Sequence, residues 1–202
     1  LHDIQAIAKI VSATSAIIVV DAISGLAADP LPQDEWRVDV VVSGSQKGLM
    51  LPPGLGFLSA GSRAVALNQT AKCPRFYYDL KLYQKALVDS DTPFTSALTL
   101  VLALDETLRM IQVKGFSQHL SETARLAEAT RAAVRAIKLE TFAKERFSNG
   151  VTSVKVPSGI DGEKLTKIMR DEQGVTMAGG QGDMKGKIFR IGHMGYYDQF
   201  YI

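Results

Sequence analysis

A single lysine stands in a loop rich in glycine, serine and proline, directly after a valine-rich run. The run covers residues 38–42 and reads as a largely buried strand, and Lys47 follows it within the stretch 43–56. Partial shielding from water disfavours an ammonium group, which leaves the free amine available to form a Schiff base with an aldehyde. On loop position alone, an ordinary solvated lysine in a turn is the more common case.

An acidic residue follows the preceding apolar run. Residues 16–20 are all apolar, and Asp21 comes directly after them. Because α/β sheets bind ligands just beyond the carboxyl ends of their strands, we expect Asp21 and Lys47 to serve one site. A lysine that forms an imine and an acid that pairs with a pyridinium nitrogen are two groups that a pyridoxal phosphate (PLP) site needs. Taken by itself, Asp21 fits a turn or a helix-capping position equally well.

Two further stretches are suited to binding anions. Arg190 interrupts the apolar pattern of residues 188–191, and its planar guanidinium can hold an α-carboxylate through two parallel hydrogen bonds. An arginine that faces water from an edge strand is the alternative for this pattern. The 91–95 loop carries hydroxyls ahead of a long predicted helix, a geometry suited to a phosphate group. A helix cap at Thr95 or Ser96 would explain this loop without any ligand.

Five separated segments together carry a resemblance to a known family. In this order they resemble the class V aminotransferases of PLP fold type I, in particular the serine/alanine-glyoxylate (serine-pyruvate) branch, some of whose members are labelled soluble hydrogenase subunits. The resemblance covers nearly the whole chain. The segments are Asp21-Ala22-Ile23-Ser24, Ser43-Gly44-Ser45-Gln46-Lys47, Pro52-Pro53-Gly54, Asp91-Thr92-Pro93-Phe94-Thr95 and Arg190-Ile191-Gly192-His193.

The resemblance implies a role for each candidate residue. Lys47 would be the catalytic residue that forms a Schiff base with pyridoxal 5'-phosphate, and Thr92 would reach the phosphate of the neighbouring subunit's cofactor in a homodimer. Arg190 would bind the substrate carboxylate. The implied reaction moves an amino group from a small amino acid, serine or alanine, to glyoxylate or pyruvate. The cofactor-binding residues that the resemblance implies are Asp21, Ser24, Ser45, Gln46, Lys47 and Thr92.

Two other functions stay open at this point. A cysteine desulfurase or lyase of the same fold would need a nucleophilic cysteine on a mobile loop, whereas Cys73 follows the large-domain helix, next to Lys72 and Pro74. The chain would also suit a non-catalytic role, as a fragment, an accessory subunit or a degenerate homologue, because the family's phosphate-binding loop lies in a half that would precede Leu1.

The order of the patterns predicts an α/β fold in two parts. Residues 1–95 would form the C-terminal part of the large domain of a PLP fold type I enzyme, a mainly parallel sheet with helices. Residues 96–202 would form long connecting helices and a small C-terminal α+β domain, truncated where the family has another helix. Family members are about twice this length, as the resemblance implies, so we expect an internal portion of a longer protein.

Two amphipathic helices are predicted to begin the second part. The first ends at Gly115 with its apolar stripe in the core, and the second begins at Ser117. His119 has polar neighbours and is predicted to lie on the surface. The aromatic stretch 76–83 is assigned to packing or to a subunit interface, because no basic cluster accompanies it. The stripe consists of Ala97, Val101, Leu104, Leu108 and Ile111, and the predicted buried face of the second helix of Leu120, Ala124, Ala127, Val134 and Ile137.

Beyond residue 150 the pattern changes to short strands around one helix. Strands are predicted at 152–156, 175–177 and 187–191, and Asp161 is predicted to cap the helix. His193 lies three residues beyond Arg190, on the opposite face of a continuing strand, so it is not expected as a second substrate contact.

The composition describes a globular chain and argues against several classes of function. Its 202 residues, 46% hydrophobic and 22% charged, can bury a sizeable core in one or two domains. A net charge of +2 on scattered side chains argues against nucleic-acid binding. The longest apolar stretches have only strand length, so no membrane span is expected. With one cysteine and no recognisable signal peptide, the chain is expected in the cytoplasm or an organelle, and no metal site is predicted.

Overall fold

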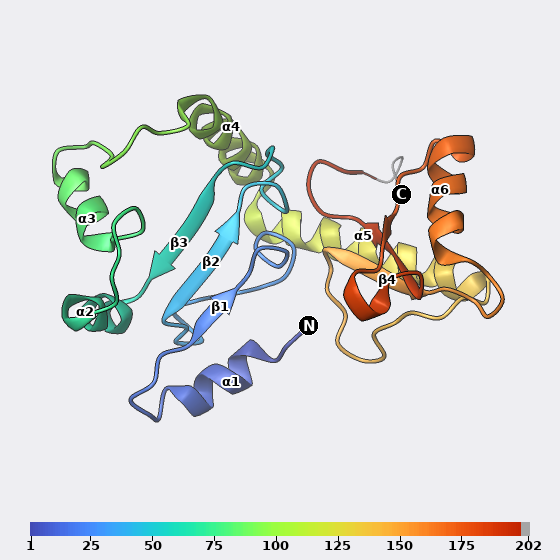
Figure 1. Cartoon of the computed structure of the whole chain (residues 1–202), viewed down its shortest axis with the longest axis horizontal. Helices are drawn as coiled ribbons and strands as arrows, with labels where there is room; N and C mark the ends of the chain where they lie inside the picture. Colours follow the sequence, from blue (N-terminus) through green and yellow to red (C-terminus); the bar gives the residue numbers. More distant parts are fainter. Residues whose placement is uncertain (199–202) are drawn as a thin grey trace.

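Two three-stranded sheets organise the part of the chain that the computed structural model describes, residues 1–198. Residues 199–202, the end of the range predicted for the small C-terminal domain, lie outside it. The strands are β1 (Val19–Asp21), β2 (Val40–Gly44), β3 (Gly56–Ala60), β4 (Val151–Lys155), β5 (Ala178–Gly179) and β6 (Ile188–Gly192). The first sheet has the order β1-β2-β3, and the second has the order β4-β6-β5. Helices α4 (Leu98–Lys114) and α5 (Phe116–Ala136) lead from one sheet to the other (Figure 1).

The first sheet joins a parallel pair of strands to an antiparallel pair. β1 and β2 run in the same direction, with Asp21 beside Val42, whereas β3 runs against β2 (Figure 1). Helix α1 (Ile4–Val11) packs against this sheet in an apolar core. The valines of β2 are mostly buried, as predicted, although the strand begins at Val40, two residues later than expected.

The predicted core stripe of α4 is confirmed only in part. Leu104 and Ile111 pack against the loops that follow β1 and β2, and Ile111 is 6% exposed. Val101 and Leu108 are 42% and 40% exposed, so the prediction of a continuous buried stripe is wrong there, because these loops cover only part of the helix. Gly115, at φ +90°, ends α4 and opens α5. The other helices are α2 (Ser62–Thr70), α3 (Leu80–Val88), α6 (Gly162–Gln173) and the 3₁₀ turn η1 (Gly182–Met184).

The buried face of α5 differs from the predicted one. The prediction is confirmed at Ala127 and Val134, but it is wrong at Ile137, which is 68% exposed, and at His119, which is 6% exposed rather than on the surface. The helix faces polar loops, so polar side chains with hydrogen-bond partners occupy part of its inner face, and hydrophobicity alone locates that face wrongly. The buried residues of α5 are His119, Thr123, Leu126, Ala127, Thr130, Arg131 and Val134.

The second sheet places β6 between two antiparallel neighbours. β4 pairs with one side of β6 and the two-residue β5 with the other, so Arg190 does not lie on an edge strand. The core on this side contains Val134 of α5, Val154 of β4 and Phe189 of β6. The predicted strand at 175–177 is displaced to Ala178–Gly179, because β5 pairs only beside Phe189 and Arg190.

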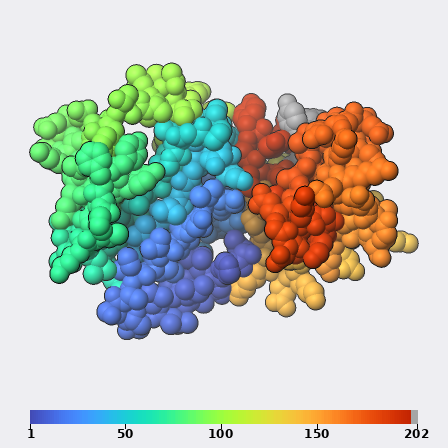
Figure 2. All heavy atoms as spheres, viewed as in Figure 1, coloured from blue at the N-terminus to red at the C-terminus, as the bar shows by residue number. Residues whose placement is uncertain are grey.

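Each sheet lies in a lobe of its own. The space-filling view shows the second sheet and α6, orange to red, beside the lobe that carries the first sheet, blue to green (Figure 2). Asp161 accepts hydrogen bonds from Glu163 N at 3.0 Å and Lys164 N at 3.1 Å, which confirms the predicted cap of α6. Within residues 1–198, no helix combines the length and the apolar character that crossing a membrane requires.

Candidate active site

The ends of β1 and β2 bring the candidate acid and lysine to one edge of the first sheet. The parallel register pairs Asp21 with Val42, two residues before β2 ends at Gly44, and Lys47 follows in the next turn. The backbone ladder continues one residue beyond the strand, since Ala22 N donates to Val42 O at 2.8 Å. Both residues therefore leave the sheet at its carboxyl edge, the edge at which parallel strands bind ligands.

Neither of these side chains is neutralised by an ion pair within residues 1–198. Asp21 is exposed, and its Oδ1 accepts a single hydrogen bond, from Ile23 N at 3.0 Å. Lys47 is half-buried, and its Nζ makes no hydrogen bond or ion pair in the described part of the chain. An amine and a carboxylate that the protein leaves available at one edge fit the two reactive ends of pyridoxal, its aldehyde and its ring nitrogen.

The loop that carries Lys47 is held in shape by Ser45. The Ser45 hydroxyl is fully buried, donates to Pro52 O at 2.7 Å and accepts from Leu55 N at 3.2 Å. The backbone adds a bond from Ser45 N to Leu55 O at 3.0 Å and one from Met50 N to Lys47 O at 3.0 Å. Ser45 therefore uses its hydroxyl inside the loop.

The loop that carries Lys47 is also pressed against the segment that follows Asp21. A Cβ added at Gly48 would clash with the carbonyl oxygen of Leu26 and would lie 3.1 Å from Cβ of Ala27. Only glycine allows this approach of the two backbones. Ala27 and Met50 both adopt positive φ angles, +60° and +63°, so the backbone is strained on each side of the contact. This packing sets the position of Lys47 relative to the segment that begins at Asp21.

The remaining cofactor-binding candidates, Ser24, Gln46 and Thr92, are exposed in their loops. Ser24 and Gln46 are both exposed, and the Gln46 side chain folds back over Gly44, where an added Cβ would lie 2.7 Å from its Oε1. Thr92 is exposed in the loop before α4, where its Oγ1 donates to Phe94 O at 2.8 Å and lies 3.1 Å from Ser96 Oγ.

No contact within the described residues joins Thr92 to Asp21 or Lys47 of the same chain. The alternative explanation of its loop does not hold either. The N-cap of α4 is Ala97, which has no capping side chain, so neither Thr95 nor Ser96 caps the helix.

Arg190 belongs to the second lobe but is linked to the Lys47 loop through the chain that follows β6. The guanidinium is half-buried, its Nε donates to Gly179 O at 3.0 Å, and no carboxylate within residues 1–198 pairs with it. The two terminal nitrogens are thus left for a ligand. Five residues further on, a Cβ added at Gly195 would lie 3.6 Å from Lys47 O. The structure shows no direct contact of Arg190 with Asp21 or Lys47.

Two buried histidines form a part of this region that sequence reasoning missed. The Nε2 of His119 lies 3.0 Å from Ala27 O, and burial lowers the pKa of His119 despite that bond. The His193 Nδ1 lies 2.5 Å from Asn149 O, its Nε2 lies 2.9 Å from Thr152 Oγ1, and burial also lowers its pKa. A carbonyl can only accept, so each ring donates to it, and burial, which lowers the pKa, favours the neutral ring.

These histidines line one cavity of about 260 Å³ between the lobes. It lies next to the Lys47 loop, because Met50 and Gly195 also line it. The spacing of His119, Thr123, Leu126 and Thr130 along one face of α5 is the sequence signal that would have located His119. Within residues 1–198, no three acidic, histidine or cysteine side chains gather as a metal site.

The chain is similar to known proteins along most of its length. The chain is 41% identical over 197 residues to the soluble hydrogenase small subunit of Synechococcus sp. (strain PCC 6716), covering 97% of this chain and 51% of that protein. It is 36% identical over 183 residues to a serine–glyoxylate aminotransferase of Arabidopsis thaliana, covering 89% of this chain and 46% of that one. The chain thus spans about half the length of the curated relatives that it matches.

A solved structure and a family model also match most of the chain. The crystal structure of pyridoxamine-pyruvate aminotransferase from Mesorhizobium loti superposes with a TM-score of 0.91 at 31% identity, covering 98% of this chain and 52% of that one. The family model "Aminotransferase class-V" matches residues 1–187, a range that includes Asp21, Lys47 and Thr92 but ends before Arg190. The chain therefore belongs to the class-V aminotransferase family, a family of transaminases.

Proposed function

We propose that this chain supplies the catalytic lysine of a PLP-dependent aminotransferase that acts on a small amino acid, serine or alanine, with glyoxylate or pyruvate as acceptor. The observation that carries the proposal is the pair Asp21 and Lys47, which leave one edge of the first sheet without ion-pair partners in the described part of the chain. A serine–glyoxylate aminotransferase and an alanine–glyoxylate aminotransferase among the similar proteins support the substrate class.

The chemistry divides among three side chains. When bound, pyridoxal phosphate supplies an aldehyde for an amine and a ring that accepts electrons from the substrate Cα. Lys47 would hold the aldehyde through its amine, with loss of water, until the substrate amino group takes its place, and the released amine would then take the Cα proton as a general base and return a proton as a general acid. Asp21 would pair with the ring nitrogen and favour its protonated form. Arg190 binds the carboxylates of donor and acceptor, so one site serves both half-reactions.

The packing around Gly48 supports this division of roles. Proton transfer requires the amine to stay within hydrogen-bonding reach of the reacting carbon, and a lysine on a loose loop would lose that position. The contact between Gly48 and Leu26 holds the Lys47 loop against the segment that begins at Asp21. Ser45 serves in this proposal through the shape of the loop, whereas Ser24 and Gln46, both exposed, are left to contact the cofactor.

We also propose that the protein is a homodimer in which Thr92 completes the neighbouring subunit's site. Tyr77 stacks on Phe94 at 4.6 Å between ring centroids, and Phe76 meets the same ring edge-on at 5.4 Å. Phe76 and Tyr78 are 72% and 84% exposed, and exposed aromatic surface of this kind is typical of an interface. Because Thr92 bonds Phe94, a second copy that covers these rings also covers Thr92.

The alternative of a cysteine desulfurase has less support. Cys73 is exposed in the segment between α2 and α3, and its Sγ lies 3.9 Å from Pro74 O. The neighbouring cation, Arg75, donates from Nη1 to the carbonyl oxygen of Cys73 at 3.0 Å, and its guanidinium also donates to the Asp79 carboxylate, so no hydrogen bond from it to Sγ is formed within the described residues. Release of sulfide from L-cysteine that disappears in Cys73→Ser would favour this alternative over transamination.

Covalent capture of the cofactor tests the main proposal. We expect a visible absorbance band when pyridoxal phosphate is added, bleaching by borohydride, and a reduced adduct that peptide mass spectrometry assigns to Lys47. The Lys47→Ala variant should show neither band nor adduct, whereas Lys9→Ala, which removes an exposed lysine of α1, should behave as the wild type. L-Serine and L-alanine should each convert the cofactor to its amine form. A wild-type protein without any adduct would leave only a non-catalytic, accessory role.

A further inference from the structure

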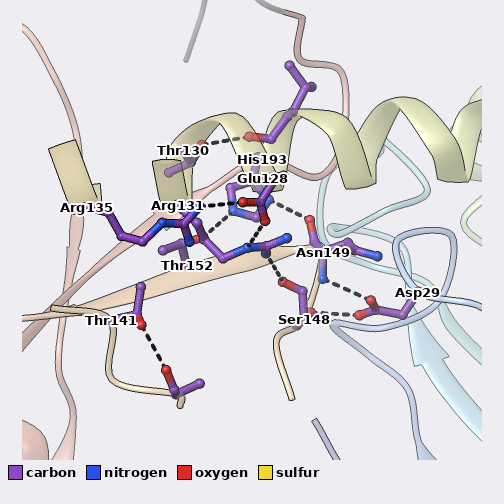
Figure 3. Close-up of polar contacts among 12 residues, drawn as sticks. Asp29, Glu128, Thr130, Arg131, Arg135, Thr141, Ser148, Asn149, Thr152 and His193 are labelled. Atoms are coloured by element: carbon purple, nitrogen blue, oxygen red, sulfur yellow. Dashed lines mark hydrogen bonds and ion pairs between the residues drawn. The ribbon is translucent and has the colours of Figure 1, made fainter. Parts of the chain in front are cut away.

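The short segment 148–150 lies between the two lobes, just before β4, and Asp29 of the first lobe forms hydrogen bonds with it. The Asp29 carboxylate accepts from Ser148 Oγ at 2.7 Å and from Asn149 N at 2.9 Å (Figure 3). Asp29 is only 7% exposed and closes a run of tight turns that starts just after Asp21, with Asp29 N donating to Gly25 O at 2.8 Å. A buried carboxylate with two such donors is a stiff connection.

The second lobe holds the same segment through His193. The imidazole is 1% exposed and donates to Asn149 O, while Thr152 Oγ1 donates to its other nitrogen (Figure 3). The backbone adds a bond from His193 N to Gly150 O at 3.1 Å. The backbone of Asn149 is thus held from both sides. Its N–H donates to Asp29, and its carbonyl accepts from His193.

The junction formed by segment 148–150, Asp29 and His193 is also closely packed. A Cβ added at Gly150 would lie 2.9 Å from Ser24 O and 3.1 Å from Cε of Met194, so only glycine fits between the two lobes. Arg131 of α5 supports the segment from a third side, with its Nη1 3.4 Å from Ser148 O and its guanidinium 5.1 Å from the centre of the Phe147 ring. Three parts of the fold therefore meet at 148–150.

We propose that Asp29 and His193 are positioning residues that hold β6, and with it Arg190, at a fixed distance from the loops that carry Asp21 and Lys47. The inference rests on the proposed function, because it assigns Arg190 to the substrate carboxylate. Arg190 lies in β6, which ends at Gly192, and His193 follows directly, so a displacement of His193 is transmitted to Arg190 over three residues. Asp29 follows Asp21 by eight residues through hydrogen-bonded turns. Asp29 and His193 both use their polar side-chain atoms within the junction, so neither is assigned a contact with the substrate.

The kinetic test compares loss of the junction with its conservative repair in the holoenzyme. In Asp29→Ala and His193→Phe, we expect the KM values for L-alanine, L-serine and glyoxylate to rise about tenfold while kcat stays within about threefold, because a misplaced arginine weakens binding of every carboxylate. Asn at position 193 keeps a donor where Nδ1 stood, and Asn at 29 keeps one acceptor, so His193→Asn and Asp29→Asn should recover most of the loss. If Asp29→Ala does not fold, Ser148→Ala removes one of its two bonds instead.

The matched control is Glu140→Gln, which breaks an exposed ion pair with Lys155 in the second lobe and should leave every KM unchanged. The double variant Asp29→Ala/His193→Phe should raise KM no further than either single change, because both break one connection. A fall in thermal midpoint with unchanged KM values, or a fully additive double variant, would overturn the positioning role.

Amide hydrogen exchange keeps this test independent of the proposed function. Asp29→Ala should speed exchange of the His193 amide in the second lobe, and His193→Phe should speed exchange of the Asn149 amide, each by about tenfold or more. Exchange that changes only on the mutated side would refute the junction. A wild-type holoenzyme that lacks transaminase activity but shows this cross-lobe exchange would refute the proposed function and keep the connection between the lobes.

Discussion

Asp21 and Asp29 lie eight residues apart in one segment, yet their surroundings are opposite. Asp21 is exposed and accepts one backbone hydrogen bond, from its own loop. Asp29 is 7% exposed and accepts two bonds from residues more than a hundred positions away. A carboxylate with unused capacity at the edge of a sheet is available to a ligand, whereas one with buried donors on both oxygens holds the fold together.

The backbone of the Lys47 loop and the side chain of Lys47 differ in the same way. The backbone of this loop is tightly fixed by Ser45 and by the contact of Gly48 with Leu26, but Nζ of Lys47 has no partner in the described part of the chain. A functional group needs both properties, a rigid support and free bonding capacity. The region therefore combines a well-packed frame with reactive atoms that the protein itself does not satisfy.

The largest expected effect comes from removing the two aspartates in turn. Asp29→Ala leaves Ser148 Oγ and Asn149 N without their acceptors in a partly buried place and should lower the free energy of unfolding by about 3 kcal/mol. Asp21→Ala should cost less than about 0.5 kcal/mol, because its carboxylate is solvated. Urea unfolding of both variants measures the difference. Equal costs would mean that the two carboxylates do not differ in the way described.

A second comparison uses two glycines of the same region. Gly48→Ala forces a methyl group against the Leu26 carbonyl and should cost about 2 kcal/mol and weaken the capture of pyridoxal phosphate by Lys47. Gly25→Ala places its methyl group where no atom lies within 4 Å and should be close to neutral in both measurements. Titration of the cofactor absorbance band and urea unfolding provide the two readouts. A Gly48→Ala variant with wild-type cofactor affinity would contradict the view that this contact positions Lys47.

The sequence predicts the features that depend on residues close together in the chain. It does not predict those that depend on contacts between distant residues. The buried strand before Lys47, the cap at Asp161 and the end of α4 at Gly115 all depend on local patterns, and the structure confirms them within about two residues. The placement of Asp21 and Lys47 at one edge follows from two consecutive parallel strands, so it could be expected before the fold was known.

The interior of the junction could not be predicted in this way. Asp29 lies in the stretch 27–36, whose two prolines and three acids are typical of a surface connection, and its buried state depends on Ser148 and Asn149, 119 and 120 residues away. His119 was assigned to the surface because polar neighbours on a helix normally face water. Its burial depends on the carbonyl of Ala27, 92 residues away, which satisfies its ring nitrogen. Long-range hydrogen bonds of this kind leave no periodic pattern in the sequence.

The smallest expected effect is a pH dependence that distinguishes the two kinds of polar group. Burial lowers the pKa of His119 and of His193, so the folded protein keeps both rings neutral while the unfolded chain takes up protons below about pH 6.5. Their stabilising contribution is therefore complete above pH 6.5 and is lost as the pH falls toward the folded pKa. Lys114 and Arg131 reinforce the shifts at His119 and His193, respectively, whereas nearby acids oppose them.

Unfolding free energies at pH 7.0 and 5.5 measure this dependence, which cannot exceed about 1.4 kcal/mol per pH unit for each histidine. His119→Gln and His193→Asn remove the titrating ring while keeping an amide donor at the bonded position. Each should therefore reduce the slope of the unfolding free energy against pH by up to about 1.4 kcal/mol per pH unit. A slope that persists in the double histidine variant would show that other groups carry the dependence, and the two imidazoles would then contribute only through packing.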